Sequence, residues 1–330
     1  MEQDALKRKN KKLIVIFTVV GVVLVLIAVV IALNFSFLKD VFVGMGYRPS
    51  DEMAEIRDDL KLTGKGWVIF NASLPELKER QEFNQYCRES ENTAAVLGCY
   101  RGDKIYVYNI LNEELEGIRE LTAAHELLHA VYSRMSVADK DKWGNLVHKV
   151  YSDNKDVMGE EIELYDDSEK AEEMYVRAGT EVADLPLELE EHFGEIFENQ
   201  DLIVSYYDSY IRVFREIENH LREIYAKIEK LGGEIEDATS RYEEGVAALN
   251  NDIAEFNNCA KTPNCFSSNA VFNRQRNALI GRQNGLVDLY NSVNDLINQY
   301  NDLVAEYNDN VLHGQILNQA MNSAEEVKGF

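Results

Sequence analysis

The stretch from His125 to His129 (His-Glu-Leu-Leu-His) has the residue types and the spacing of a metal-assisted hydrolytic site. On a helix, residues four apart lie on one face, so the imidazoles of His125 and His129 can reach a single metal ion. Glu126 points to a neighbouring part of that face, where it could hold a water molecule and accept its proton. The pattern predicts a zinc ion with Glu126 as the general base.

The sequence around this motif favours a buried helix. Its flanks are apolar and helix-forming, and no Pro or Gly interrupts residues 119–134. The simpler alternative is a surface helix with two incidental histidines. An apolar segment argues against it, because an unpaired polar group there costs free energy.

A catalytic zinc ion needs a third protein ligand. The residues after His129 lack the third histidine of the HExxHxxGxxH pattern, and His148 lies on a helix where a surface or core role is simpler. Glu173 and Glu181 are eight residues apart on a later predicted helix and share a face. We expect Glu173 as the ligand and keep Glu181 as the alternative. Weaker candidates are Glu172, Glu161 and Glu163, and Tyr165 or Tyr175 could donate to a developing oxyanion.

The motif and the later glutamate together resemble the gluzincin group of zinc metallopeptidases. The resemblance covers roughly residues 100–185 and implies His125, His129 and Glu173 as zinc ligands and Glu126 as the base. It further implies a peptide or protein substrate. The chain departs from the group's Asn-Glu-x-x-x-Asp pattern, because Glu172 precedes Glu173 and Arg177 lies four residues after it.

The N-terminus has the pattern of a membrane anchor. Residues 1–12 carry a net charge of +3, and residues 13–33 are uncharged and rich in Val, Ile and Leu. This span is long enough to cross a bilayer as one helix, and the basic flank would keep the N-terminus cytoplasmic. A cleaved signal peptide is the alternative, but no clear small-x-small cleavage site follows. We expect a single-pass protein of the cell membrane with an extracytoplasmic catalytic domain.

The net charge of −24 leaves −27 on the chain after residue 12. A nucleic-acid binder would need a basic face, so this class is disfavoured. The four cysteines fall into two close pairs, Cys87 with Cys99 and Cys259 with Cys265. Outside the cytosol the natural expectation is two local disulfides, with free buried thiols as the alternative.

Residues 34–197 are predicted to form a mainly helical, zincin-like α+β domain with a small antiparallel sheet. Residues 34–50 connect it to the anchor. Strands are expected at 67–70, 94–99 and 104–108, and the last could be a sheet edge that takes up a peptide by strand addition. A purely structural hairpin is an equal alternative. Helices are expected at 51–62, 74–86, 114–134, 137–151, 171–183 and from about 187.

Residues 198–330 are predicted to form a long antiparallel helical hairpin. Apolar residues recur every seven positions in two runs that a break at residues 257–269 separates. Gly232-Gly233 could loosen the first helix, and a parallel dimer through that helix is the competing arrangement. The first run comprises Phe214, Leu221, Ile228, Ile235, Tyr242, Leu249 and Phe256, and the second Leu279, Leu286, Val293, Tyr300 and Tyr307.

These features favour a membrane-anchored zinc metallopeptidase whose hairpin spaces the catalytic domain, recruits substrate or mediates homo- or hetero-oligomers. The alternative is a membrane-tethered coiled-coil scaffold with a non-catalytic zincin-like domain. The presence of Glu126 argues against that alternative. A metal-dependent amidase acting on cell-wall peptides is a third hypothesis, for which the sequence offers no wall-binding repeat.

Overall fold

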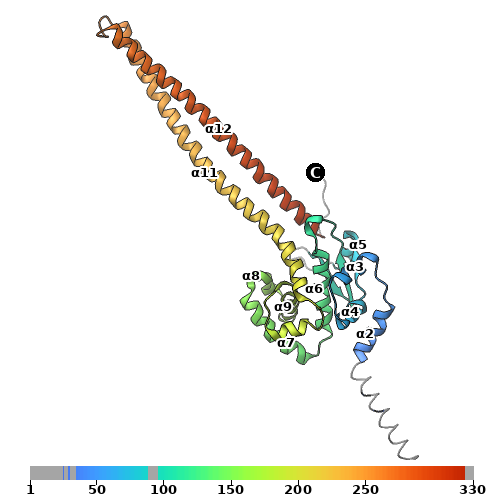
Figure 1. Ribbon diagram of the computed structural model, residues 1–330. Helices are drawn as coiled ribbons and strands as arrows, with labels where there is room; N and C mark the ends of the chain where they lie inside the picture. The colour runs from blue at the N-terminus through green and yellow to red at the C-terminus, as the bar shows by residue number, and fades with distance from the viewer. Residues whose placement is uncertain (1–24, 26–28, 30–34, 88–95, 324–330) are drawn as a thin grey trace, which may run out of the picture. The chain divides into compact units, whose positions relative to one another are not determined.

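The computed structural model describes residues 35–87 and 96–323, together with Val25 and Val29 (Figure 1). The described residues form two compact units, one up to Ile211 together with Gln319–Ser323, and one of Arg212–Asn318. The predicted basic segment 1–12 and nearly all of the predicted span 13–33 lie outside the described residues. Among the residues that are described, no helix combines the length and apolar character that a bilayer span requires. The predicted boundary between the zincin-like domain (34–197) and the hairpin (198–330) stays a prediction.

The first unit is mainly helical, as predicted. Several of its helices begin at side-chain caps: Ser50 accepts from the N–H of Met53, and Thr63 accepts from the N–H of Gly66. The helices are α2 (Phe35–Gly46), α3 (Asp51–Asp59), α4 (Gly64–Ala72), α5 (Arg80–Tyr86), α6 (Ile118–Ser133), α7 (Val137–Asp153), α8 (Lys155–Met158), α9 (Asp167–Glu181) and α10 (Leu187–Phe193).

Helix α6 carries the histidine motif and lies at the centre of this unit. Its residues Leu127 and Leu128 are fully buried, and it packs against α3, α4, α9 and the sheet. Gly117 precedes α6 with φ 88°, and a Cβ there would approach a ring carbon of Tyr206 to 2.8 Å. Packing on every side therefore fixes the rotation of α6, and with it the direction of its histidines.

The sheet has three strands in the order β1-β3-β2, with β1 at Glu76–Lys78, β2 at Gly98–Arg101 and β3 at Lys104–Tyr108. The predicted hairpin of the last two strands is confirmed, and Gly102 and Asp103 both have positive φ in its turn. The prediction of an antiparallel sheet was wrong in one respect, because β1 pairs with β3 in parallel. The prediction of β3 as an edge was also wrong: β3 is central, and β2 is the edge strand nearest α6.

Two further local predictions were wrong. Residues 67–70 form part of α4 rather than a strand, because the Thr63 cap starts a helix that buries Ile69 and Phe70. The helix predicted at 74–86 is divided into β1 and α5, and the pairing of β1 with the distant β3 explains the difference. Residues 34–50, predicted as a connector, contain α2, which packs against α4.

The predicted helical hairpin is confirmed, as α11 (Gln200–Lys261) and α12 (Asn269–Met321) run side by side (Figure 1). In the second unit the ring of Tyr242 lies 5.7 Å from that of Tyr290, and His220 lies 3.1 Å from Glu306. Residues farther along α11 thus meet residues earlier in α12, which is the antiparallel arrangement. Helix α11 continues through Gly232-Gly233 without a break.

Candidate metal centre

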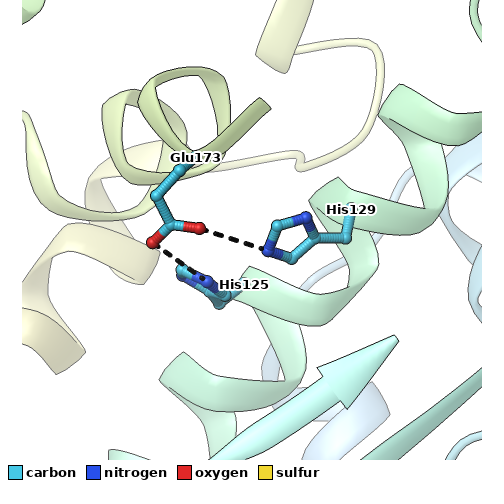
Figure 2. Close-up of side chains that lie close together, drawn as sticks. All are labelled: His125, His129 and Glu173. Atoms are coloured by element: carbon cyan, nitrogen blue, oxygen red, sulfur yellow. Dashed lines mark ion pairs between the residues drawn. The ribbon is translucent and has the colours of Figure 1, made fainter. Parts of the chain in front are cut away.

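The side chains of His125 and His129 lie on one face of α6, as the four-residue spacing predicts. Their ring centroids are 5.0 Å apart, and both rings point toward the carboxylate of Glu173 (Figure 2). The two side chains are 23% and 19% exposed. They are therefore close enough to share one ligand and are still reached by solvent.

Glu173 of α9 completes the group. Its Oε1 lies 3.9 Å from Nε2 of His125, and its Oε2 lies 3.6 Å from Nε2 of His129. One ligand atom from each of the three residues lies within 4.8 Å of the others. The close packing of α9 on α6, with the ring of Tyr175 5.3 Å from that of Tyr132 and Gly179 next to Leu128, brings Glu173 to this position. The expected His-His-Glu group is thus brought together by the fold.

Glu172, a weaker candidate for the third ligand, has a different place. Its Oε1 lies 2.8 Å from Nδ1 of His129, on the side of the ring that faces away from Glu173. A carboxylate in this position fixes the ring and leaves Nε2 free to bind a metal ion. Burial lowers the pKa of His129, but the bond to Glu172 and the charges of Glu126 and Glu173 raise it to about 9. Burial lowers the pKa of His125 to about 3, against the charge of Glu173.

Arg177 fixes the carboxylate of Glu173. Its Nε donates to Oε1 of Glu173 at 2.7 Å, and its second guanidinium branch donates to Glu161 and to the carbonyl of Met158, each at 2.6 Å. Glu181, the alternative ligand, lies 4.0 Å from Arg177 and is not part of the His-His-Glu group. Burial raises the pKa of Glu181 to about 8, so this carboxyl is largely protonated at neutral pH.

Glu126 lies under the edge strand β2. The residue is only 5% exposed, and it accepts a hydrogen bond from the backbone N–H of Tyr100. Burial raises the pKa of Glu126 to about 7, with His129 opposing the shift. At Gly98 a Cβ would lie 2.8 Å from Cγ and Oε1 of Glu126. Glycine at this position therefore lets the strand pass close to the carboxylate.

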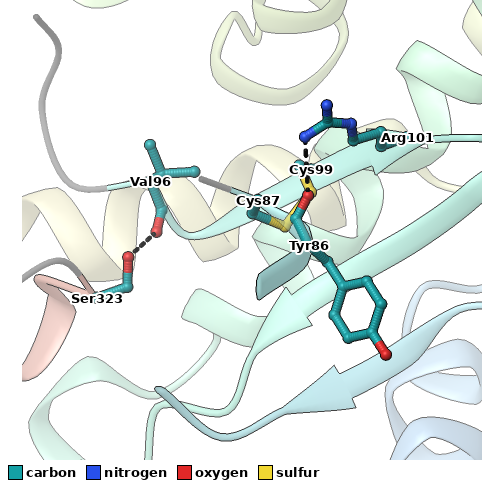
Figure 3. Close-up of a disulfide and its surroundings, with 6 residues drawn as sticks. All are labelled: Tyr86, Cys87, Val96, Cys99, Arg101 and Ser323. Atoms are coloured by element: carbon teal, nitrogen blue, oxygen red, sulfur yellow. Dashed lines mark hydrogen bonds between the residues drawn. A yellow bond between two sulfur atoms is a disulfide. The ribbon is translucent and has the colours of Figure 1, made fainter. Parts of the chain in front are cut away.

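The disulfide between Cys87 and Cys99 fastens this strand. It joins the residue directly after α5 to the second residue of β2, and the guanidinium of Arg101 also donates to the carbonyl of Tyr86 (Figure 3). On the strand's other side Ser323 donates to the carbonyl of Val96 at 3.2 Å. Three attachments thus hold the segment that lies over Glu126. The second predicted pair, Cys259 with Cys265, also forms a disulfide.

The other candidates lie elsewhere. His148 is on the exposed face of α7, and Glu163 pairs with Lys155 and Lys170. Tyr175 is buried with its hydroxyl 2.9 Å from Nε2 of His192, whereas Tyr165 lies near Glu173 and Arg177. In the sequence, Arg177 stood out only as a departure from the Asn-Glu-x-x-x-Asp pattern, and the roles of Gly98 and Tyr100 were missed. The four-residue spacing from Glu173 could have indicated Arg177.

The donor set fits zinc. Tetrahedral zinc with ligands at about 2.0–2.1 Å needs donor atoms roughly 3.3–3.5 Å apart. The two histidine–glutamate distances, 3.9 Å to Oε1 and 3.6 Å to Oε2, are slightly longer than this value and run to different oxygens, so side-chain rotations that bring one oxygen toward both rings would complete the site. Two imidazoles and one carboxylate are also a ligand set found in catalytic zinc sites.

Comparison with protein-family models, with curated proteins and with solved structures found no match.

Proposed function

We propose that this chain is a zinc-dependent metallopeptidase that hydrolyses peptide bonds. The observation that carries the proposal is the convergence of His125, His129 and Glu173, with Glu126 beside them. When bound, zinc would supply Lewis-acid polarisation of the scissile carbonyl and would lower the pKa of a water molecule. His125, His129 and Glu173 would hold the ion, and Arg177 and Glu172 would orient two of these ligands.

Glu126 would act as the general base. Its pKa of about 7 places it between the ionised and neutral forms near neutral pH, which suits a group that first takes a proton and then gives it to the leaving amine. The N–H of Tyr100 orients the carboxylate. Positioned acid–base groups of this kind contribute about 10²–10⁴-fold to rate.

A peptide substrate would align with the outer edge of β2. In the pairing with β3, Cys99 is opposite Tyr106 and Leu97 receives a bond from the N–H of Tyr108, so Gly98 and Tyr100 turn their backbone groups outward. The N–H of Tyr100 already bonds Glu126, which leaves the backbone groups of Gly98 and the carbonyl of Tyr100 for a peptide. An extended peptide can pair with such an edge by strand addition. A hollow of about 650 Å³ between α7 and α9 is lined in part by Tyr132 and by Glu172, the residue that bonds His129, and would give further room for a substrate.

The proposal places the enzyme at the cell membrane, with residues 13–33 as a single anchor and the catalytic unit outside the cytosol. The hydropathy of this span and the two disulfides support it. The hairpin of α11 and α12 would space the catalytic unit or mediate oligomers. The length of that hairpin also keeps a second candidate function open, a tethered scaffold without catalysis.

The test uses the full-length chain in a neutral detergent. Zinc content is measured for the wild type, Glu126→Gln, Glu173→Ala and Glu181→Ala, and each protein is incubated with a peptide library. We expect about one zinc per chain in the wild type and in Glu126→Gln and Glu181→Ala, with loss in Glu173→Ala. Cleavage should occur in the wild type and disappear in Glu126→Gln. Absence of zinc after reconstitution, or undiminished cleavage by Glu126→Gln, would overturn the proposal.

A further inference from the structure

The tip of the hairpin differs in charge from the rest of this acidic chain. Residues 256–287 contain Lys261, Arg274, Arg276 and Arg282 and no Asp or Glu, so they carry +4. The remainder of the chain after residue 12 then carries −31. No other stretch after residue 40 is free of acidic residues over such a length.

Three of these cations are available to a ligand. Arg282 pairs with Asp252 of α11. Lys261, Arg274 and Arg276 are exposed, and the described part of the chain gives none of them an ion pair. Arg274 and Arg276 are the sixth and eighth residues of α12, beyond the first turn to which the dipole effect of a helix end is confined, and neither has an ion pair within the described residues. The stability of α12 therefore does not explain these arginines.

The fold of the tip presents these cations on an ordered base. The Cys259–Cys265 disulfide closes the turn between the two helices. Beneath it, the rings of Phe256, Phe266 and Phe272 pack with centroids 5.1–5.2 Å apart. A turn that needed only to reverse the chain would require neither the disulfide nor the aromatic cluster.

We propose that the hairpin tip is a binding site for a linear, phosphate-rich polyanion. Two of the three available cations are arginines, whose planar guanidinium matches phosphate oxygens in pairs. The tip favours a polyanion in solution over a bilayer. In the turn and the start of α12, residues 257–279, no large apolar side chain is exposed for insertion, and the three phenylalanines are half-buried in their own cluster. The exposed apolar side chains of the tip, Ile280 and Val287, lie farther along α12, at least about 16 Å from its start at roughly 1.5 Å per residue.

Screening makes local binding compatible with the negative charge of the whole chain. At about 0.1 M salt the Debye length is about 10 Å, so charges farther along the hairpin act weakly at the tip. Glu255 is the nearest acidic residue in sequence to Lys261, about 9 Å away at roughly 1.5 Å per helical residue. Neutralising Glu255 should therefore strengthen binding, whereas neutralising the three cations should weaken it.

The test measures binding of long-chain inorganic polyphosphate to the full-length protein in detergent at 50 mM and 200 mM salt. The triple variant Lys261→Gln/Arg274→Gln/Arg276→Gln is compared with Arg222→Gln/Lys227→Gln/Lys230→Gln, which removes the same charge from the middle of α11. At 50 mM salt we expect the tip variant to bind about 3- to 150-fold more weakly, since each of three exposed pairs contributes about 0.2–1 kcal/mol and 1.4 kcal/mol is tenfold. The control variant should bind like the wild type, and Glu255→Gln should bind more tightly.

Helix content by circular dichroism checks that both triple variants are folded. Poly-glutamate of similar length and vesicles of anionic phospholipid serve as alternative ligands. Weak binding of poly-glutamate and of vesicles by the wild type, together with clear binding of polyphosphate, would support the proposal. Equal losses in the two triple variants, stronger binding of poly-glutamate, or binding of vesicles without binding of polyphosphate would overturn it. Zinc content does not enter this test, so its result is independent of the proposed peptidase activity.

Discussion

Replacing Gly98 by alanine tests whether close passage of β2 over α6 positions Glu126. A Cβ at residue 98 would lie 2.6 Å from Cγ2 of Thr122 and 2.8 Å from two atoms of Glu126. Thr122 is buried, and its hydroxyl donates to the carbonyl of Ile118 at 2.7 Å, so its methyl group has little freedom to move. The strand would therefore have to shift away from α6.

The expected cost follows from two opposing effects. Overpacking of a closely packed region costs about 1–3 kcal/mol, whereas loss of glycine's flexibility in the unfolded chain returns about 0.4–1 kcal/mol. We expect Gly98→Ala to lower the free energy of unfolding by about 1–2 kcal/mol. Both tryptophans, Trp67 and Trp143, lie in the first unit, so urea unfolding followed by their fluorescence reports on that unit. At an m-value of about 2–3 kcal/mol/M, the midpoint should fall by about 0.5 M.

Two further variants test whether the contact of residue 98 with α6 causes the loss of stability. Gly144→Ala in α7 has nothing within 4 Å of the new Cβ and should be neutral or stabilising by up to about 1 kcal/mol. Thr122→Ser removes the nearest methyl group, so in the Gly98→Ala background it should recover part of the lost stability. If Gly98→Ala and Gly144→Ala have the same midpoint, or if Thr122→Ser brings no recovery, β2 does not rest on α6 as described. In the folded Gly98→Ala protein, kcat for any cleaved peptide should fall while zinc content stays near that of the wild type.

Three other predictions concern single contacts. Glu172→Gln should weaken zinc binding about 10–100-fold, and Glu173→Gln by more than Glu172→Gln, as measured by competition with a chelator. Removal of the Cys87–Cys99 disulfide should lower the free energy of unfolding by about 3 kcal/mol, which the tryptophan fluorescence would detect. Burial lowers the pKa of His192 to about 4, below its ordinary value of 6.5, so the neutral ring is favoured in the fold. The stability due to His192 is complete above pH 6.5 and declines toward pH 4, and in His192→Gln this part of the pH dependence should disappear.

The site could be predicted from sequence to the extent that it is local. The relation of His125 to His129 is set by one turn of helix, and Glu173, not Glu181, lies with the two histidines in the structure. The contribution of β2 could not be predicted, because the contact of Gly98 with Glu126 joins residues that no periodic pattern relates. The hydrogen bond from the N–H of Tyr100 also comes from the backbone, which any residue except proline supplies.

The errors in the fold have the same origin. The run from Trp67 to Phe70 is apolar and too short for its periodicity to distinguish helix from strand, and the Thr63 cap decides the outcome. Residues 76–78 form a strand only because β3 lies alongside, almost thirty residues later. The heptads of α11 and α12 were predictable because their pattern extends over many turns.

The charges around the two histidines lead to a final prediction, that zinc binding releases protons. Three carboxylates, those of Glu126, Glu172 and Glu173, lie close to His125 and His129, and Arg177 pairs with one of them. Without a metal ion, proton uptake offsets the remaining negative charge: His129 has a pKa of about 9, and Glu126 of about 7. At pH 7, His129 is therefore charged and Glu126 is about half protonated. A zinc ligand has to be neutral imidazole, and a nearby dication favours ionised Glu126.

Zinc binding at pH 7 should then release at least about one proton per chain, and fewer as the pH rises above 9, where His129 is already neutral. Titration calorimetry in buffers of different ionisation enthalpy measures this number directly. Glu172→Gln removes the carboxylate that holds the proton on His129, so this variant should release clearly fewer protons. Release of no protons by the wild type, or equal release by both proteins, would show that the carboxylates do not charge His129 and that the ion binds elsewhere.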